Sequence, residues 1–518
     1  MKRYFPLITV LALMLGACNE KDNPGPEESP APAIVSVSPE DGVTGLTERN
    51  LTIVFTFDQN VKCSDQAKTL ASVDQGASVD GVSAYATGLT VNVGGLTRGK
   101  SYTLTLPEGL VQGYRANQKA TPAIQFHFTT KALPTPPVDP SNPQDWEKAS
   151  VAVVNMGVGW NLGNTLEANS GDVNNMWIEA FTSRNSSDYE TAWGQPVATR
   201  ELIHMFREEG FGAIRVPVTW YPHMGDLHTT LGQDSQGSWR GVWNMSDWTG
   251  YDVDPMWMAR VKEVVGYVID EGMYCILNVH HDTGSASTAW LRADEQMYQT
   301  YRERYIELWK QIATEFEPYG QRLVFESFNE MLDKNSTWNY STAAAHEVIN
   351  KYNADFVATV RATGGKNTYR NLILNTYAAS SQPEALKDFR LPADVVDGHL
   401  MAEVHSYAPY RFAFDTANPQ EVFDDACDKE VRAIIEGLNT YFVSKGIPCV
   451  LGEFGADTGK RQEKELAKQA TCYINAATKY HIPCFYWMGL SNEDDRAVPK
   501  WTKPVLKDAI LKAYEESK

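Results

Sequence analysis

From about residue 146 onwards, short apolar segments alternate with long amphipathic ones, and this alternation leaves few folds open to the chain. Segments rich in Val, Ile and Leu, separated by helical patterns, are typical of parallel strands that are each followed by a helix. Eight such segments occur: NMGVGWNLG, GAIRVPV, YCILNVHH, LVFESFNE, NLILNTY, LMAEVHSY, CVLGEFGA and CFYWMGL. This count predicts an α/β domain over residues 146–518 that folds as a (β/α)8 TIM barrel.

Helical patterns fill the gaps between these segments. They cover residues 199–210, 256–272, 295–318, 343–363, 430–446 and 461–480, with a last helix at 503–517. A doubly wound nucleotide-binding sheet would need a phosphate loop after its first strand. Here the glycine-rich stretch from Gly157 to Gly163 has one residue too many for that loop and places Trp160 where phosphate would lie. The barrel is therefore the better prediction.

Residues 33–131 follow a different pattern. IVSVSP, LTIVFTF, LTVNVGGL, SYTLTL and IQFHFTT alternate apolar and polar residues with a period of two, which predicts an all-β sandwich. The stretch opens with SVSPEDG and closes with FHFTT, and it resembles the bacterial Ig-like domains that precede secreted enzymes. No chemistry-bearing cluster occurs in it, so we expect a spacer or docking module. A Pro-rich linker at 132–145 follows.

The N-terminus has the pattern of a secretion signal. Lys2 and Arg3 precede a nine-residue apolar run that is too short to span a bilayer. Small residues then lead to Cys18, as in the signal of a bacterial lipoprotein. Residues 1–17 are expected to be removed, Cys18 to be lipidated, and residues 18–32, acidic and Pro-rich, to form a disordered tether. We therefore expect a protein that is anchored by lipid at the outer membrane and faces outward at the cell surface.

The overall charge excludes one class of partner. Lys and Arg number 46 and Asp and Glu 65, so the net charge is −19. Phosphate backbones would repel such a chain, and nucleic acid is not an expected partner. The 14 Trp and 24 Tyr residues supply flat aromatic faces that suit neutral ring-shaped ligands such as sugars. A monomer is expected.

The C-terminal ends of the predicted strands are polar, and in a TIM barrel these ends build the active site. Two of them end in carboxylates, Glu330 on the fourth strand and Glu453 on the seventh. A pair of carboxylic acids on opposite sides of a barrel mouth is what hydrolysis of a glycosidic bond requires, since one must protonate the leaving oxygen and the other must be ionised. The other polar ends are Asn161, Asn164, Arg215, His280, His281, Asn329, His405, Tyr407 and Trp487.

The motifs FNE, LGEFG, GWNLGNTLE, NVHHD and HSY occur in the order found in glycoside hydrolase family 5, which the region 150–518 resembles. The resemblance implies a retaining mechanism with Glu330 as acid/base and Glu453 as nucleophile. It also implies catalytic-site roles for Asn329, Arg215, His280, His405 and Tyr407. Trp487, His281, Asn164 and Glu167 match positions that contact sugar. The specificity segment 171–193 has no counterpart that can be carried over.

The function expected from this resemblance is endo-hydrolysis of β-1,4-glucan, such as cellulose, xyloglucan or mixed-linkage glucan. Two alternatives stay open: a β-1,4-mannanase of the same family, and a surface lipoprotein that binds glycan without cleaving it. No cofactor is expected and no metal, because adjacent residues such as His280 and His281 point to opposite faces of a strand and no third ligand stands at suitable spacing. A pepsin-like protease is excluded, since its paired Asp-Thr-Gly motifs belong to an almost all-β fold.

Overall fold

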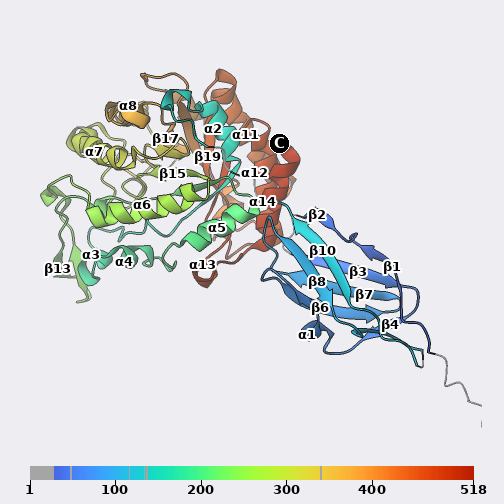
Figure 1. Cartoon of the computed structure of the whole chain (residues 1–518). Coiled ribbons are helices and arrows are strands. Elements are labelled where there is room, and N and C mark those ends of the chain that lie inside the picture. The colour runs from blue at the N-terminus through green and yellow to red at the C-terminus, as the bar shows by residue number, and fades with distance from the viewer. Residues whose placement is uncertain (1–27, 47–49, 116, 133–134, 136–137, 339–340) are drawn as a thin grey trace, which may run out of the picture. The chain divides into compact units, whose positions relative to one another are not determined.

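The computed structural model describes all residues except 1–27, 47–49, 116, 133–134, 136–137 and 339–340 (Figure 1). The expected signal segment and Cys18 lie outside the described residues, as does most of the expected tether. The chain divides into two compact units, residues 1–134 and 135–518. In the described parts, no helix is both long and apolar enough to cross a membrane.

The first unit is a β-sandwich, as predicted. One sheet has the order β1 (Ile34–Ser38), β3 (Leu51–Phe57), β7 (Gly88–Gly94) and β6 (Ser78–Tyr85). The other has the order β2 (Val43–Leu46), β10 (Ile124–Thr130), β8 (Ser101–Leu106) and β5 (Ser72–Val73). The short strands β4 (Val61–Cys63) and β9 (Val111–Gly113) pair with each other, and α1 spans Ala67–Leu70. The inward residues of both sheets, among them Phe55, Leu104 and Phe126, form one core.

The second unit is a closed eight-stranded parallel barrel, which confirms the predicted fold. Its strands are β11 (Val158–Asn161), β12 (Ala213–Val216), β15 (Tyr274–Asn278), β16 (Leu323–Glu326), β17 (Leu372–Ser380), β18 (Leu400–Ser406), β19 (Cys449–Phe454) and β20 (Cys484–Trp487). Each lies within one of the eight apolar segments or extends it by a few residues. Strand β11 pairs with β20, and this pairing closes the barrel.

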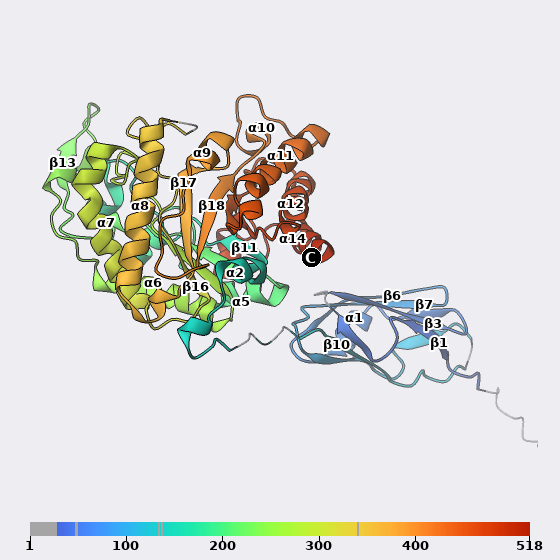
Figure 2. The ribbon, with the colours of Figure 1, turned by 90° about the horizontal axis from the view of Figure 1, so that it is seen from above.

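Helices surround the strands (Figure 2). The long ones are α5 (Arg200–Glu209), α6 (Pro255–Asp270), α7 (Glu295–Phe316), α8 (Ala343–Ala362), α11 (Asp425–Tyr441), α12 (Glu463–Thr478) and α14 (Pro504–Ser517). Side-chain hydrogen bonds from N-cap residues determine where several of these helices begin. Asp424 accepts two backbone N–H groups, and α11 therefore begins five residues before the expected position. The shorter helices are α2 (Ala149–Met156), α3 (Trp177–Phe181), α4 (Ser186–Glu190), α9 (Pro383–Asp388), α10 (Tyr410–Ala413) and α13 (Asp494–Ala497).

Some elements were not expected from the sequence. The segment 171–193 contains α3 and α4, and a hairpin of β13 (Thr230–Gln233) and β14 (Trp239–Val242) follows the second barrel strand. Helix α3 packs on this hairpin at Gly241, where any Cβ would collide with Ala180 and the backbone of Met176. Both elements are insertions that follow barrel strands.

The inside of the barrel has an apolar layer and a polar layer. Ile276, Val324, Ile373 and Met401 pack with the apolar face of α2 in one buried cluster. Two residues further along the same strands, on the same face, stand polar side chains that are 0% exposed: Asn278, Glu326, Asn375 and Glu403. Strand β12 follows the same rule, with Ala213 in the apolar layer and Arg215 in the polar one. The apolar layer therefore supports a polar layer directly below the C-terminal strand ends.

Candidate active site

Arg215 is the centre of the polar layer and is completely buried. Its Nε and Nη2 donate to the two carboxylate oxygens of Glu326 at 2.7 and 2.8 Å. Its Nη1 donates to Glu453 at 2.7 Å and to the side-chain oxygen of Asn161 at 3.0 Å, and Nη2 also donates to Asn329 Oδ1 at 2.9 Å. A single guanidinium thus connects strands β11, β12, β16 and β19. It also fixes the side-chain orientation of two predicted site residues, Glu453 and Asn329.

His405 lies between the two predicted catalytic carboxylates. Its Nδ1 is 2.9 Å from Glu330 Oε1 and 3.6 Å from Glu453 Oε2, and its Nε2 is 3.2 Å from Glu403 Oε1. One side-chain oxygen of Glu330, one of Glu453 and one ring nitrogen of His405 all lie within 4.8 Å of one another. Retaining glycosidases hold their two carboxyl groups about 5–5.5 Å apart and inverting ones about 6.5–9.5 Å. The observed spacing matches the retaining class.

The surroundings push the pKa values of the two carboxyl groups apart. Burial alone would raise the pKa of Glu453, but the charges of His405 and Arg215 and the hydrogen bond from Tyr407 lower it below its ordinary value. Burial raises the pKa of Glu330, and the negative charge of Glu453 adds to this, against the opposing effect of His405. Near neutral pH, Glu453 is therefore the carboxylate and Glu330 the better holder of a proton.

The two site histidines carry different charges. The negative charge of Glu453 and the hydrogen bonds to Glu330 and Glu403 overcome the effect of burial and raise the pKa of His405 to about 10. His405 is then a cation with both ring nitrogens protonated, so it has no lone pair to offer a metal ion. Burial lowers the pKa of His280 well below its ordinary value, and its Nδ1 accepts a hydrogen bond from Asn278 Nδ2 at 3.0 Å. The neutral ring of His280 stacks on Trp487, with the two ring planes 7° apart.

A cavity of about 950 Å³ opens above these groups. It brings together most of the side chains that the sequence singled out: His280, His281, Asn329, Glu330, His405, Tyr407, Glu453 and Trp487. Arg215 lies behind them, within the barrel. Tyr407 donates to Glu453 Oε2 at 2.7 Å, on the carboxylate oxygen that Arg215 does not hold. Glu453 therefore has both oxygens fixed by donors before any substrate is present.

Two residues that were predicted to contact sugar, Asn164 and Glu167, are not among those that line the cavity. Glu167 is 0% exposed, and its carboxylate accepts the backbone N–H groups of Asn164 and, at 2.9 Å, Thr165. Asn164 has a positive φ of 57° at this turn. The turn begins at Gly163, which lies under the Trp487 ring so closely that a Cβ there would be 2.9 Å from the ring. In this structure Glu167 fixes the turn beneath Trp487, and its contact with a sugar stays a prediction.

Sequence reasoning missed several residues of the site. Glu326 and Glu403 complete the network around Arg215 and His405, and the signal for them was a charged residue inside an otherwise apolar strand. Trp338, Tyr410 and Phe414 line the cavity from loops, where the sequence has no periodicity to place them. From the segment 171–193, Trp193 reaches the site: its ring lies 5.4 Å from the ring of His281.

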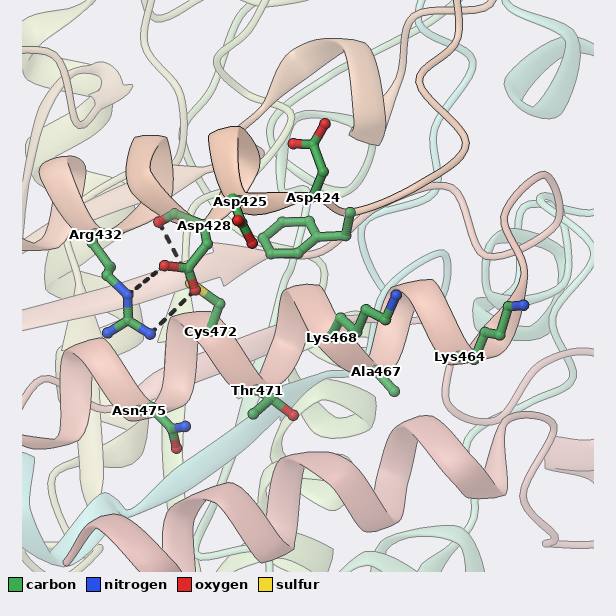
Figure 3. A pocket seen from close by; sticks show the side chains of 11 residues that line it. Asp424, Asp425, Asp428, Arg432, Lys464, Ala467, Lys468, Thr471, Cys472 and Asn475 are labelled. Carbon is green, nitrogen blue, oxygen red and sulfur yellow. Dashed lines mark hydrogen bonds and ion pairs between the residues drawn. The ribbon is translucent and has the colours of Figure 1, made fainter.

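A second cavity, of about 390 Å³, lies on the outside of the barrel between α11 and α12 (Figure 3). Asp428 and Arg432 form an ion pair there with a shortest distance of 2.6 Å, and Lys468 pairs with Glu465. None of the predicted site residues lines it. The cavity at the strand ends is therefore the site that the sequence predicted.

Comparison with known proteins agrees with this geometry. A family model described as cellulase (glycosyl hydrolase family 5) matches residues 172–493, and one described as bacterial Ig-like domain matches residues 28–130. The chain belongs to glycosyl hydrolase family 5. Its barrel is therefore that of a glycosidase, preceded by an Ig-like domain.

Relatives within the family cover the barrel. Endoglucanase A of Ruminococcus albus is 33% identical over 369 residues, which is 69% of this chain and 90% of that protein. A family 5 enzyme of Prevotella bryantii B14, solved with the xyloglucan tetradecasaccharide XXXGXXXG, is 38% identical with a TM-score of 0.62 and covers 71% of this chain and 99% of its own. A xyloglucan-specific endo-β-1,4-glucanase from a metagenomic library, solved with cellotriose, is 30% identical with a TM-score of 0.58 and covers 70% and 98%.

We predict that Tyr407→Phe moves the acidic limb of the pH profile of this family 5 enzyme upward. The hydroxyl hydrogen bond favours the ionised form of Glu453, so its loss raises the pKa of Glu453. Hydrolysis that needs the carboxylate then begins to fail at a higher pH. The measurement is kcat/KM against pH, since this ratio reports groups of the free enzyme.

Tyr267→Phe is the matched control for this prediction. Tyr267 also donates to a carboxylate at 2.7 Å, that of Glu263, but on the outer helix α6. The control should leave the acidic limb in place. An acidic limb that stays unchanged in Tyr407→Phe would show that this hydrogen bond does not set the ionisation of Glu453.

Proposed function

We propose that this chain is an endo-acting, retaining β-1,4-glucanase in which Glu330 is the acid/base and Glu453 the nucleophile. The observation that carries the proposal is the close pair of carboxyl groups whose pKa values are shifted in opposite directions. Attack on the anomeric carbon needs an ionised group, and departure of the sugar oxygen needs a proton. Each pKa shift favours the protonation state that the proposed role requires.

The reaction follows from the positions of the donors. Glu453 attacks the anomeric carbon while Glu330 gives its proton to the leaving oxygen, and a glycosyl-enzyme forms. Glu330 then takes a proton from water, which attacks the same carbon and releases Glu453. Asn329 uses its side-chain oxygen to accept from Arg215, so its amide N–H groups remain to donate to the sugar 2-hydroxyl. Such a bond gains strength in the transition state.

Polymeric β-glucan is the substrate class that fits. A cavity of about 950 Å³ is at the upper end of the range for ligand pockets, which leaves room for several sugar units. The relatives are endoglucanases, and the similar structures include one solved with a xyloglucan oligosaccharide and one of a xyloglucan-specific enzyme. Xyloglucan, whose backbone is β-1,4-glucan, is therefore our first choice. A mannanase remains the second candidate, since the two backbones differ only in the orientation of one hydroxyl.

The substrate assignment predicts the result of a polysaccharide panel. Purified enzyme should release oligosaccharides from xyloglucan, mixed-linkage glucan or soluble cellulose, and the viscosity of the polymer should fall early because cleavage is internal. Konjac-type and galactose-bearing β-mannans form the comparison arm. Cleavage of mannan with every β-glucan left intact would contradict the proposal, and no cleavage of any polymer would favour the alternative of a glycan-binding lipoprotein.

The roles of the two carboxyl groups predict different rescue behaviour. Glu453→Ala should lose nearly all activity, and azide should restore it with formation of an α-glycosyl azide, because the small anion takes the place of the carboxylate. Glu330→Ala should keep turnover mainly on substrates whose leaving group needs no proton, and azide should give the β-azide. NMR of the products tells the two apart. An inverted hydrolysis product from the unmutated enzyme would overturn the assignment of Glu453 as nucleophile.

We also propose that Cys18 carries lipid and holds the enzyme at the outer membrane, facing outward. The support is the sequence pattern before Cys18 and the Pro-rich, acidic segment after it. An enzyme tethered in this way would meet polymers too large to enter the cell. Expression of Cys18→Ser should move the enzyme from the detergent-soluble membrane fraction to the aqueous one, with Cys63→Ser as the control. Equal membrane retention of both variants would contradict lipidation at Cys18.

A further inference from the structure

Four large apolar side chains are exposed on the two insertions that follow β11 and β12. The exposed fractions are 37% for Trp177 and 53% for Phe181 in α3, and 59% for Leu231 and 57% for Trp239 in the hairpin of β13 and β14. None of the four lines the catalytic cavity, and the mechanism above assigns no role to them. Large apolar side chains that gather on an exposed surface mark a place where another molecule binds.

The register of the hairpin places Leu231 and Trp239 on one face. Leu231 pairs with Gly241, and Gln233 pairs with Trp239. Residues directly opposite each other point to the same side of a sheet, as do residues two apart along a strand, so Leu231 and Trp239 share the face of Gly241. This is the face on which α3 packs, because a Cβ at Gly241 would collide with Ala180.

Helix α3 presents its two exposed rings beside the same contact. Ala180 faces Gly241, and Trp177 and Phe181, four residues apart, lie on one neighbouring face of the helix. The backbone N–H of Met176 donates to the oxygen of Gly241 at 2.9 Å, which fixes the start of α3 on the hairpin. Figure 1 shows α3 beside the hairpin at one edge of the barrel unit. The four exposed side chains therefore surround one contact and form a single patch, here called the insertion surface.

The charged side chains of the two insertions are bound within the protein. Asp234 pairs with Arg240 at 3.0 Å, and Arg184 donates to the backbone oxygens of Leu227 and Pro222. The other charged residues of the segment 171–193 also have hydrogen-bond partners: Asp172, Glu179, Asp188 and Glu190. In a chain with a net charge of −19, the insertion surface is therefore not an electrostatic binding site.

The polar groups around the four apolar side chains suit a neutral ligand rich in hydroxyl groups. The hairpin exposes uncharged donors and acceptors: Thr230, Gln233, Ser235, Gln236 and Ser238. Flat rings such as those of Trp177 and Trp239 can cover the C–H face of a sugar ring, while amide and hydroxyl side chains bond its hydroxyl groups. This combination favours a neutral polysaccharide over an anionic lipid or a charged peptide.

The insertion surface is also connected to the catalytic cavity. The segment 171–193 contains Trp177 and Phe181 and ends at Trp193, whose ring lies 5.4 Å from the ring of His281 on the cavity wall. A polymer that is cleaved internally extends beyond the cavity, so another part of the same chain is available to this surface.

We propose that the insertion surface, formed by Trp177, Phe181, Leu231 and Trp239, is an accessory binding site for the β-glucan polymer, outside the catalytic cavity. This inference rests on the function proposed above. The site holds a distant part of the polymer and so raises the effective concentration of glucan at the cavity, without contact with the bond that is cleaved. It therefore contributes to the binding of long substrates and not to the turnover of short ones.

The first test compares a polymer with a short substrate. Trp177→Ala and Trp239→Ala should each raise KM for xyloglucan by about 3- to 10-fold with kcat unchanged, as expected for the loss of one aromatic contact. The kcat/KM for 2-chloro-4-nitrophenyl β-cellobioside, which has only two sugar units, should change by less than about twofold. Trp239→Phe, which keeps a ring, should recover part of the affinity for the polymer.

The second test measures binding without cleavage. The full chain with Glu453→Ala should migrate more slowly in a native gel that contains xyloglucan than in one without it. Adding Trp177→Ala and Trp239→Ala together should reduce this retardation. Tyr85→Ala is the matched control, because Tyr85 is an aromatic residue of the β-sandwich that is 89% exposed. Size-exclusion chromatography of the same proteins shows whether the insertion surface joins two copies of the chain instead.

The outcomes separate this inference from the proposed function. Unchanged KM and unchanged retardation in the variants would overturn the accessory site while the proposed function stands. An equal loss on the cellobioside would indicate an altered cavity and would also overturn it, as would a dimer that the double variant breaks with polymer binding unchanged. If the variants lose retardation but the unmutated enzyme cleaves no β-glucan, the accessory site stands and the proposed function fails.

Discussion

The guanidinium of Arg215 has no contact with water, and the rest of the site depends on how its charge is balanced. A buried charge is tolerated only when it is paired and its donors are satisfied. Arg215 directs its donors to Glu326, Glu453, Asn161 and Asn329, which lie at the ends of three other strands, β16, β19 and β11. Because the guanidinium is planar, these partners can satisfy it only in a narrow range of positions. The same requirement that stabilises the barrel interior therefore also fixes the carboxylate of Glu453, the proposed nucleophile.

The count of charges explains why the pKa values of the two carboxyl groups of the catalytic pair are shifted in opposite directions. Four carboxyl groups, Glu326, Glu330, Glu403 and Glu453, surround two cations, Arg215 and His405. Two cations can balance two carboxylates, so the cluster favours protons on the other two. Glu453 has a lowered pKa, whereas the pKa of Glu330 is raised and that of Glu403 is raised to about 7. The opposite pKa shifts of Glu330 and Glu453 thus depend on the composition of the whole polar layer.

How much of this could be predicted depended on whether a residue belongs to a regular pattern. The barrel strands were predictable because buried parallel strands are short apolar runs, and the polar residues at their ends followed from the strand positions. Glu167 has no such pattern: its carboxylate accepts backbone N–H groups of its own turn, and no periodicity in the sequence predicts that contact. The aromatic side chains of the loops are likewise placed by tertiary contacts, such as that of Phe414 with Tyr407.

A small residue next to Glu453 shows how closely this polar layer is packed. Gly452 precedes Glu453 and occupies an inward position of β19, where any Cβ would collide with the carboxylate of Glu403. Glu403 fits beneath His405 because this position has no side chain, and His405 is held in line with Glu330 because Glu403 accepts from its other nitrogen. The first glycine of the GEFG motif, Gly452, is therefore needed for space, not for backbone freedom. The spacing of the catalytic pair follows from which side chains the barrel interior can contain.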